Sequence, residues 1–154
     1  MGDNKFKKHD NLTESYENFC RIIGEHIDDI LNLTNPSKVD IVDLMTLAEN
    51  IAKEHLKSIP SSKLRDFYDY ILKIDVNDTN WFVEFALLKP KIAYHVGKET
   101  NKEKQLALKK LRYFVDSAIM KIREIEDNKA KKDKFKNFKT FFESIVAYHK
   151  VYAK

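Results

Sequence analysis

The sequence predicts an all-α fold, a compact bundle of about six helices in a single domain. Its 154 residues include only 3 Gly and 3 Pro, so turn signals are few, whereas helix-forming residues such as Lys, Glu, Leu and Ala are abundant. Hydrophobic residues make up 43% and recur at helical spacing along most of the chain. A chain of this length supplies one core but is short for two.

The N-terminal part begins with a polar segment. We expect residues 1–10 to form a mobile basic tail, because they contain little apolar side chain, and residues 11–154 to form the single helical-bundle domain. Asn11, followed three residues later by glutamate, resembles a capping box that opens the first helix. Asn35-Pro36 ends this helix, because proline cannot continue it.

Three further helices are expected in the middle of the chain. The second begins near Asp40 and ends before Pro60, and the third covers residues 63–74. The fourth starts at Trp81, after a polar stretch. Pro90 is expected to kink this fourth helix, because it lacks a backbone N–H.

The last two helices have the clearest apolar stripes. Thr100 with Glu103 resembles a capping box before the fifth helix, and a lysine-rich connector at residues 128–132 precedes the sixth. Apolar or aromatic side chains recur at helical spacing in both helices. These are Leu111, Phe114, Val115, Ala118, Ile119, Ile122 and Ile125 in the fifth, and Phe135, Phe138, Phe142, Ile145, Val146, His149 and Tyr152 in the sixth.

Cysteine content and hydropathy predict a cytoplasmic protein. Cys20 is the only cysteine, so no internal disulfide can form, and the chain has no apolar N-terminal signal segment. The most apolar run, residues 81–88, contains Glu84 and is far shorter than the roughly 20 residues that span a bilayer. We therefore expect no membrane partner.

The charges are distributed unevenly. Residues 89–154 carry 18 Lys and Arg against 8 Asp and Glu, whereas residues 1–88 carry 10 against 16. This polarity suggests one face for a polyanion and another for a protein partner.

The fourth helix carries the most informative candidate site. At about 100° per residue, Lys91, Tyr94, His95 and Lys98 share one surface, and Lys89 belongs to the same basic stretch. Cations at this pitch can meet successive phosphates, while a tyrosine ring can stack on a base or ribose. The same pattern also fits an ordinary solvated helix face. Another side of the helix is apolar and consists of Trp81, Phe85, Leu88, Ile92 and Val96.

A second candidate site lies where the third helix begins. The free N–H groups and the dipole of a helix N-terminus favour an anion, and Lys63 and Arg65 would add two positive charges. Ordinary capping by Ser61 or Ser62 explains the serines equally well.

Signals for an enzyme are absent from the sequence. The five histidines lack metal-ligand spacing, Cys20 lies among apolar neighbours, and there is no phosphate-binding glycine loop. We expect no catalytic residue, no metal and no cofactor.

Three segments resemble one known family. Residues 88–99, LKPKIAYHVGKE, resemble the central motif of the small subunit of type III-A CRISPR effector complexes, the Csm small subunit. Residues 141–152 resemble that family's closing helix, and residues 61–65 its upstream motif. Two positions depart from the family pattern: Lys98 stands where arginine is expected, and Ala153-Lys154 replaces a glycine-rich ending. Lysine keeps the charge but loses bidentate phosphate geometry.

The resemblance implies a non-catalytic RNA-binding subunit of an antiviral ribonucleoprotein. Several copies of a small helical bundle would line up along the guide RNA and target RNA as the minor filament. The other partners would be the large polymerase-like subunit, the backbone subunits and further copies of the chain. The RNA-backbone contacts would come from Lys63, Arg65, Lys89, Lys91 and Lys98, with Tyr94 or His95 against the RNA.

A different class of function is compatible with the same residues. The basic amphipathic last helix could make the protein a helical adaptor that docks this helix into a groove of a partner protein. Charge reversal at Lys91 and Arg65 separates the two interpretations, because only the RNA-binding subunit depends on those charges.

Overall fold

The computed structural model describes the backbone of residues 2–153 and the side chains of residues 11–153. Within these residues the chain forms seven α-helices, one short π-helix and no strand, which confirms the all-α fold in a single compact domain. The elements in chain order are α1 (Gly2–Leu31), α2 (Ile41–Asn50), η1 (Ile51–His55), α3 (Ser61–Leu72), α4 (Trp81–Ala86), α5 (Leu88–Lys98), α6 (Lys102–Arg123) and α7 (Asn128–Tyr152).

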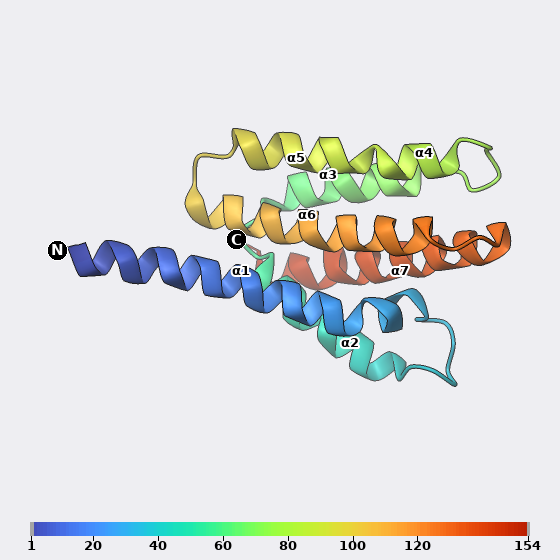
Figure 1. Cartoon of the computed structure of the whole chain (residues 1–154), viewed down its shortest axis with the longest axis horizontal. Helices are drawn as coiled ribbons and strands as arrows, with labels where there is room; N and C mark the ends of the chain where they lie inside the picture. The colour runs from blue at the N-terminus through green and yellow to red at the C-terminus, as the bar shows by residue number, and fades with distance from the viewer. Residues whose placement is uncertain (1, 154) are drawn as a thin grey trace.

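The helices form three layers (Figure 1). Helices α6 and α7 lie in the middle, α1 and α2 cover one side, and α3, α4 and α5 cover the other. Packing follows this order, since α6 contacts α1 and α5, while α7 contacts α2, η1 and α3. The two helices with the clearest apolar stripes therefore build the centre of the molecule.

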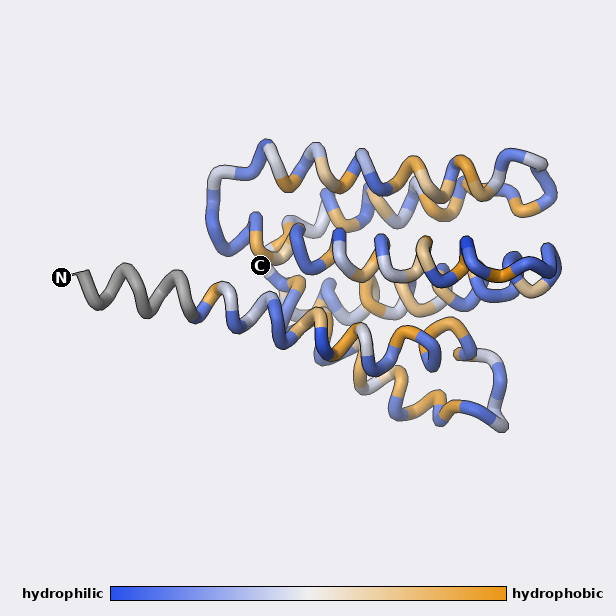
Figure 2. The backbone as a smooth tube through the Cα atoms, in the orientation of Figure 1, coloured by the Kyte–Doolittle hydropathy of each residue, from blue (hydrophilic) through white to orange (hydrophobic). Residues whose placement is uncertain are grey.

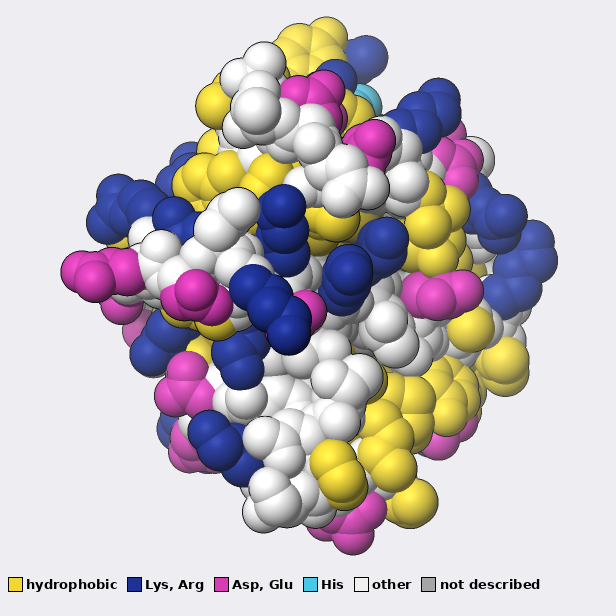
Figure 3. Space-filling model, turned by 90° about the vertical axis from the view of Figure 1, so that its right-hand side faces the viewer, with side chains coloured by type: hydrophobic (Ala, Val, Ile, Leu, Met, Phe, Trp, Pro, Cys, Tyr) yellow, Lys and Arg dark blue, Asp and Glu magenta, His cyan; other side chains and the backbone are white. Residues whose placement is uncertain are grey.

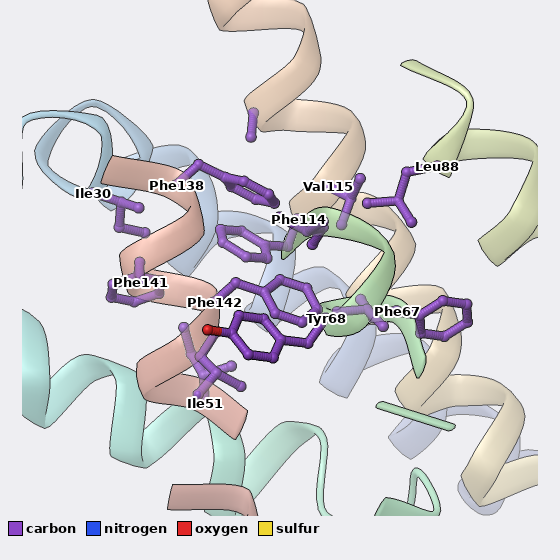
Figure 4. Packing of buried hydrophobic residues seen from close by; sticks show 14 of the residues in the cluster. Ile30, Ile51, Phe67, Tyr68, Leu88, Phe114, Val115, Phe138, Phe141 and Phe142 are labelled. Carbon is purple, nitrogen blue, oxygen red and sulfur yellow. The ribbon is translucent and has the colours of Figure 1, made fainter. Parts of the chain in front are cut away.

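The core is centred on the aromatic side chains of α7. The ring of Phe138 lies 5.2 Å from that of Phe85 in α4, 5.3 Å from Phe114 in α6 and 5.9 Å from Phe142 one turn later. Phe142 in turn stacks on Tyr68 of α3 at 6.1 Å (Figure 4). Burial of these large rings and their tilted contacts join α3, α4, α6 and α7 into one core.

Apolar residues recur along each helix, alternating with polar ones (Figure 2). The expected apolar side of α4 and α5 is confirmed, because all five of its residues are buried. In α2 the first residue, Ile41, is 46% exposed, whereas Leu44 and Ala48 are buried. Among the described residues, none of the helices is both long and apolar enough to cross a bilayer.

Two helices begin at residues other than those expected. The side chain of Asn101, not Thr100, caps α6 by accepting a hydrogen bond from the amide of Lys104 at 3.0 Å. The carboxylate of Asp127 accepts from the amide of Ala130 at 2.9 Å, so α7 begins at Asn128. The expected connector, residues 128–132, is therefore the start of α7, because an aspartate at this position caps the helix and complements its dipole.

The first helix also begins earlier than expected. It begins at Gly2 rather than near Asn11, and no proline or glycine occurs between residues 3 and 10 to end it. The predicted mobile tail, residues 1–10, lies outside the residues whose side chains the structure describes. Its mobility, and a domain boundary at residue 11, stay predictions.

Pro90 explains the break between α4 and α5. Proline has no N–H to donate to the carbonyl of Ala86 four residues earlier, and its ring would clash with that carbonyl. Accordingly α4 ends at Ala86, and α5 begins at Leu88 with Pro90 in its first turn. The expected single fourth helix is thus two short helices, and the expected second helix consists of α2 followed by the π-helix η1, while the remaining four expected helices correspond to single α-helices.

A buried lysine of α6 contacts side chains of α1 and η1. Lys110 of α6 is 2% exposed, and its Nζ donates to the Ser15 hydroxyl of α1 at 2.6 Å and lies 3.0 Å from His55 Nδ1 at the end of η1. Burial, followed by the charge of Lys110, lowers the pKa of His55 to about 4. A neutral His55 therefore accepts a hydrogen bond at Nδ1 from the ammonium group of Lys110.

The aromatic core predicts a large loss of stability for Phe138→Ala. Truncation of this fully buried ring removes three aromatic contacts and leaves a cavity, which should cost about 3–5 kcal/mol of unfolding free energy. Urea denaturation followed by circular dichroism measures this cost. Val151→Ala is the control on the same helix, because Val151 is 72% exposed and should change stability by less than about 1 kcal/mol. Equal stability of the two variants would contradict the assigned core.

The buried histidines predict a loss of stability in mild acid. Burial lowers the pKa of His55, His95 and His149 in the folded chain, whereas an unfolded histidine titrates near pH 6.5. Below about pH 6.5 the unfolded state binds protons that the folded state does not, so the unfolding free energy decreases as the pH is lowered. The contribution of His55 to this decrease continues until about pH 4, where the folded histidine is protonated as well.

His55→Gln tests the contribution of one histidine. Glutamine can still accept from Lys110 but does not titrate, so the variant should lose less stability between pH 7 and pH 5 than the parent protein. The expected difference is on the order of 2 kcal/mol. Urea denaturation at both pH values measures it, and an unchanged pH dependence would show that His55 titrates as it does in the unfolded chain.

Candidate nucleic-acid interface

Helices α3 and α5 lie next to each other and run in opposite directions. The start of α3 therefore meets the end of α5, where the His95 ring packs edge-on against Phe67 at 5.4 Å. Further along, Lys91 of α5 lies over the Tyr70 ring of α3, with its Nζ 4.9 Å from the ring centroid. Cations and aromatic rings from two helices thus share one outer surface.

We call this the α3–α5 basic surface and define it by Lys63, Lys91, Tyr94, His95 and Lys98. Its exposed part is formed by Tyr94, 63% exposed, with the Nζ of Lys98 5.8 Å from its ring centroid. Among the described side chains, no carboxylate forms an ion pair with any of its three lysines. The positive charges therefore remain available to an external anion.

His95 has a different role from the lysines. Its side chain is partly buried between the helices, and its Nδ1 is buried without a hydrogen-bond partner among the described atoms. Burial first, and then the charges of Lys63 and Lys98, lower the pKa of His95. The imidazole is therefore neutral near pH 7 and orders the surface by packing on Phe67, while the charge comes from the lysines.

Arg65 lies on a different side of α3. It pairs with Asp69 at 3.7 Å, with both side chains largely exposed, and it faces a groove between α3 and α7 that also contains Lys150. No local sequence pattern pairs Lys150 with Arg65, because α7 is far from α3 in the sequence. The groove has a volume of about 620 Å³ and is lined by Ser61, Ser62, Leu64, Arg65, Val146, Ala147, His149 and Lys150.

The serines at the start of α3 do not cap it. Pro60 occupies the N-cap position, no side chain caps the helix there, and Ser61 and Ser62 are its first two residues. The Pro60 carbonyl accepts from the amides of Lys63 and Leu64 at 3.0 and 3.1 Å. The alternative explanation of these serines, that Ser61 or Ser62 caps the helix, is therefore wrong.

Lys89 belongs to neither of these places. It is partly buried, and its positive charge acts on Asp116 of α6, whose pKa it lowers against the stronger raising effect of burial. The seven residues predicted from sequence thus separate into the five of the α3–α5 basic surface, Arg65 in the α3–α7 groove, and Lys89 facing α6.

The lysines at the start of α7 gather at one end of the bundle. Figure 3 shows Lys and Arg side chains near the middle of this end, among acidic and hydrophobic ones. Two of these lysines contact the fold, because Lys131 lies over the Phe82 ring at 5.2 Å and Lys134 donates to the side chain of Asn32. The arrangement suits general attraction of a polyanion and has no built pocket.

Among residues 11–153, no three His, Cys, Asp or Glu side chains lie together in a group that could hold a metal ion. The chemistry that the described side chains offer at the α3–α5 basic surface is charge and stacking: three lysines for phosphates and one exposed aromatic ring for a base or sugar.

Comparison with known proteins identifies the family. The sequence profile of the family described as Csm2 Type III-A matches residues 38–154, which include α2, η1 and every later helix. No curated protein and no solved structure matches the chain. The match covers both the α3–α5 basic surface and the α3–α7 groove. The chain therefore belongs to the Csm2 family and is a subunit of a type III-A CRISPR effector complex.

Proposed function

We propose that this subunit is a non-catalytic RNA-binding protein of the cytoplasm that lines the duplex of guide RNA and target RNA as part of the minor filament. The observation that supports it best is the α3–α5 basic surface. Three lysines that form no ion pair with a side chain of residues 11–153 flank an exposed tyrosine there, and all of them lie within the segment that matches the family.

The chemistry of this surface fits a subunit that must accept any guide sequence. Lysine ammonium groups bind phosphate as point charges, and phosphate contacts supply affinity without reading the bases. Tyr94 is suited to the same task, since stacking on a base or ribose tolerates any sequence. The surface therefore supports binding to the RNA backbone.

The α3–α7 groove offers a second, smaller contact of the same kind. Arg65 of α3 and Lys150 of α7 line it from two helices, and the first two residues of α3, Ser61 and Ser62, line it as well. A phosphate of the same RNA strand could bind there, while partner subunits and further copies of the chain would cover other faces.

One observation opposes the adaptor interpretation. The apolar stripe of α7 is used inside the bundle, where Phe135, Phe138, Phe142 and Ile145 are fully buried. Docking this stripe into a partner groove would require the core to open. An adaptor would therefore have to use a different face from the one that its sequence pattern suggests.

Charge reversal on the α3–α5 basic surface should weaken RNA binding. Lys91→Glu with Lys98→Glu replaces two exposed cations, so the slope of log affinity against log salt should become shallower by about 1.4 for every copy of the subunit in the complex, or roughly 0.7 for each lost phosphate contact. Binding of the assembled complex to labelled target RNA at several salt concentrations measures the slope.

The matched control is Lys38→Glu with Lys136→Glu, which makes the same charge change at exposed lysines on other parts of the bundle. It should retain the slope of the parent protein. Equal effects of the two double variants would assign the binding to net charge and contradict a specific surface. Arg65→Glu alone tests the α3–α7 groove.

Lys98→Arg should strengthen the same contact. Arginine offers two parallel N–H donors to a phosphate, whereas lysine offers a point charge, and the position is exposed beside Tyr94. We expect target RNA to bind about two- to threefold more tightly, since roughly 0.5 kcal/mol corresponds to that change. An unchanged or weaker affinity in the same assay would place Lys98 away from the phosphates.

A further inference from the structure

A second groove lies on the other side of α5, between α1 and α6. It has a volume of about 730 Å³, within the range of small-molecule sites, and Leu12, Tyr16, Val96, Leu106 and Tyr113 form its apolar wall. The two tyrosine rings meet edge to face at 6.2 Å and an angle of 78°. Three helices thus present a partly buried aromatic wall that none of the predicted RNA contacts uses.

Cations from one face of α6 border this groove. Lys102, Lys109 and Arg112 fall within about 80° of one another at 100° per residue, and all three are exposed. Lys102 and Lys109 have no ion pair with any described side chain, while Arg112 Nε lies 3.7 Å from Asp116 Oδ2. The groove therefore combines an apolar wall with positive charge that fits an anionic group.

Asp116 adds an unused hydrogen-bond acceptor. Its Oδ1 is buried and has no partner among the described atoms, although its Oδ2 faces Arg112. Burial raises the pKa of this carboxyl group, which agrees with an oxygen that lacks compensating donors. A bound ligand with an N–H group at this point would satisfy an oxygen that the fold leaves unpaired.

We propose that the α1–α6 groove binds a nucleotide, with its base against Tyr16 and Tyr113 and its phosphate held by Lys102 and Lys109. An aromatic body, an attached anion and an N–H donor match the wall, the cations and the carboxylate of the groove. The nucleotide is either free or a single unstacked unit of an RNA strand. This site goes beyond the proposed function, because it uses neither the α3–α5 basic surface nor the α3–α7 groove.

The unpaired oxygen of Asp116 also predicts a base preference. Adenine, cytosine and guanine carry an exocyclic amino group that can donate to it, whereas the N3–H of uracil lies between two carbonyl oxygens that the carboxylate repels. AMP should therefore bind more tightly than UMP. Adenosine and inorganic phosphate should each bind more weakly than AMP, because each makes only part of the contacts.

Isothermal titration of the purified full chain with AMP tests the site. Lys102→Glu with Lys109→Glu should weaken AMP binding about tenfold or more, since two charge-assisted contacts are lost, while the melting temperature stays close to that of the parent protein. The matched control, Lys38→Glu with Lys136→Glu, should bind AMP normally. If the parent protein binds AMP, equal AMP affinity of the two double variants would overturn the proposal.

Asp116→Ala provides a second variant that does not depend on the lysines. It removes the unpaired acceptor and one weak surface ion pair, so the fold should be as stable as before. The preference for AMP over UMP should disappear while the affinity for UMP remains. A preserved preference would overturn the assigned orientation of the base.

The source of the nucleotide is decided by a second titration. A short single-stranded oligoribonucleotide is titrated into the Lys91→Glu, Lys98→Glu variant, with and without Lys102→Glu and Lys109→Glu. Binding of AMP assigns a free nucleotide, and binding of the oligoribonucleotide alone, lost with the added substitutions, assigns a unit of a strand. Binding of neither ligand overturns the proposal. Retention of AMP binding in the Lys91→Glu, Lys98→Glu variant separates this groove from the proposed function.

Discussion

The fold depends on the burial of the aromatic stripe of α7. Phe138 contacts rings from α4 and α6, and Phe142 stacks on Tyr68 of α3, so one helix organises both its neighbour in the middle layer and the layer above it. The lysines that share α7 with these rings must then lie on its solvated side. The burial requirement therefore determines both the core and the places where charge can be displayed.

The α3–α5 basic surface is a consequence of this packing. Apolar residues of α5 are buried against the bundle, and Phe67 of α3 contributes to the core while its edge-on contact positions His95. The remaining faces of the two antiparallel helices then point outward with their lysines. No single segment carries the surface, since Lys63 comes from the acidic part of the sequence and Lys98 from the basic part. The positions that the fold gives to these lysines therefore matter more for the α3–α5 basic surface than the net charge of either part of the sequence.

The helices and most core positions could be predicted because periodicity directly reflects burial. The disturbance near Pro90 could be predicted because proline lacks a donor, but the pattern predicts a kink within one helix, whereas the structure has a break between α4 and α5. The helix starts were less predictable, since Thr100 and Asn101 are both acceptable caps and only the folded geometry selects Asn101. Which residues of distant segments lie side by side in the fold could not be predicted from local patterns. Arg65 and Lys63 lie two residues apart in the sequence, yet Arg65 lines a different groove, together with Lys150 of α7. No local sequence pattern indicates that Arg65 and Lys150 are neighbours.

The central claim is that the α3–α5 basic surface faces the RNA in the assembled complex. The most direct test is a cryo-electron microscopy structure of the complete type III-A complex with guide and target RNA bound. We predict that the ammonium groups of Lys91 and Lys98 lie within contact distance of RNA phosphates, with Tyr94 against a base or ribose. A structure in which this surface faces solvent or a protein subunit, while the RNA passes along another face, would contradict it.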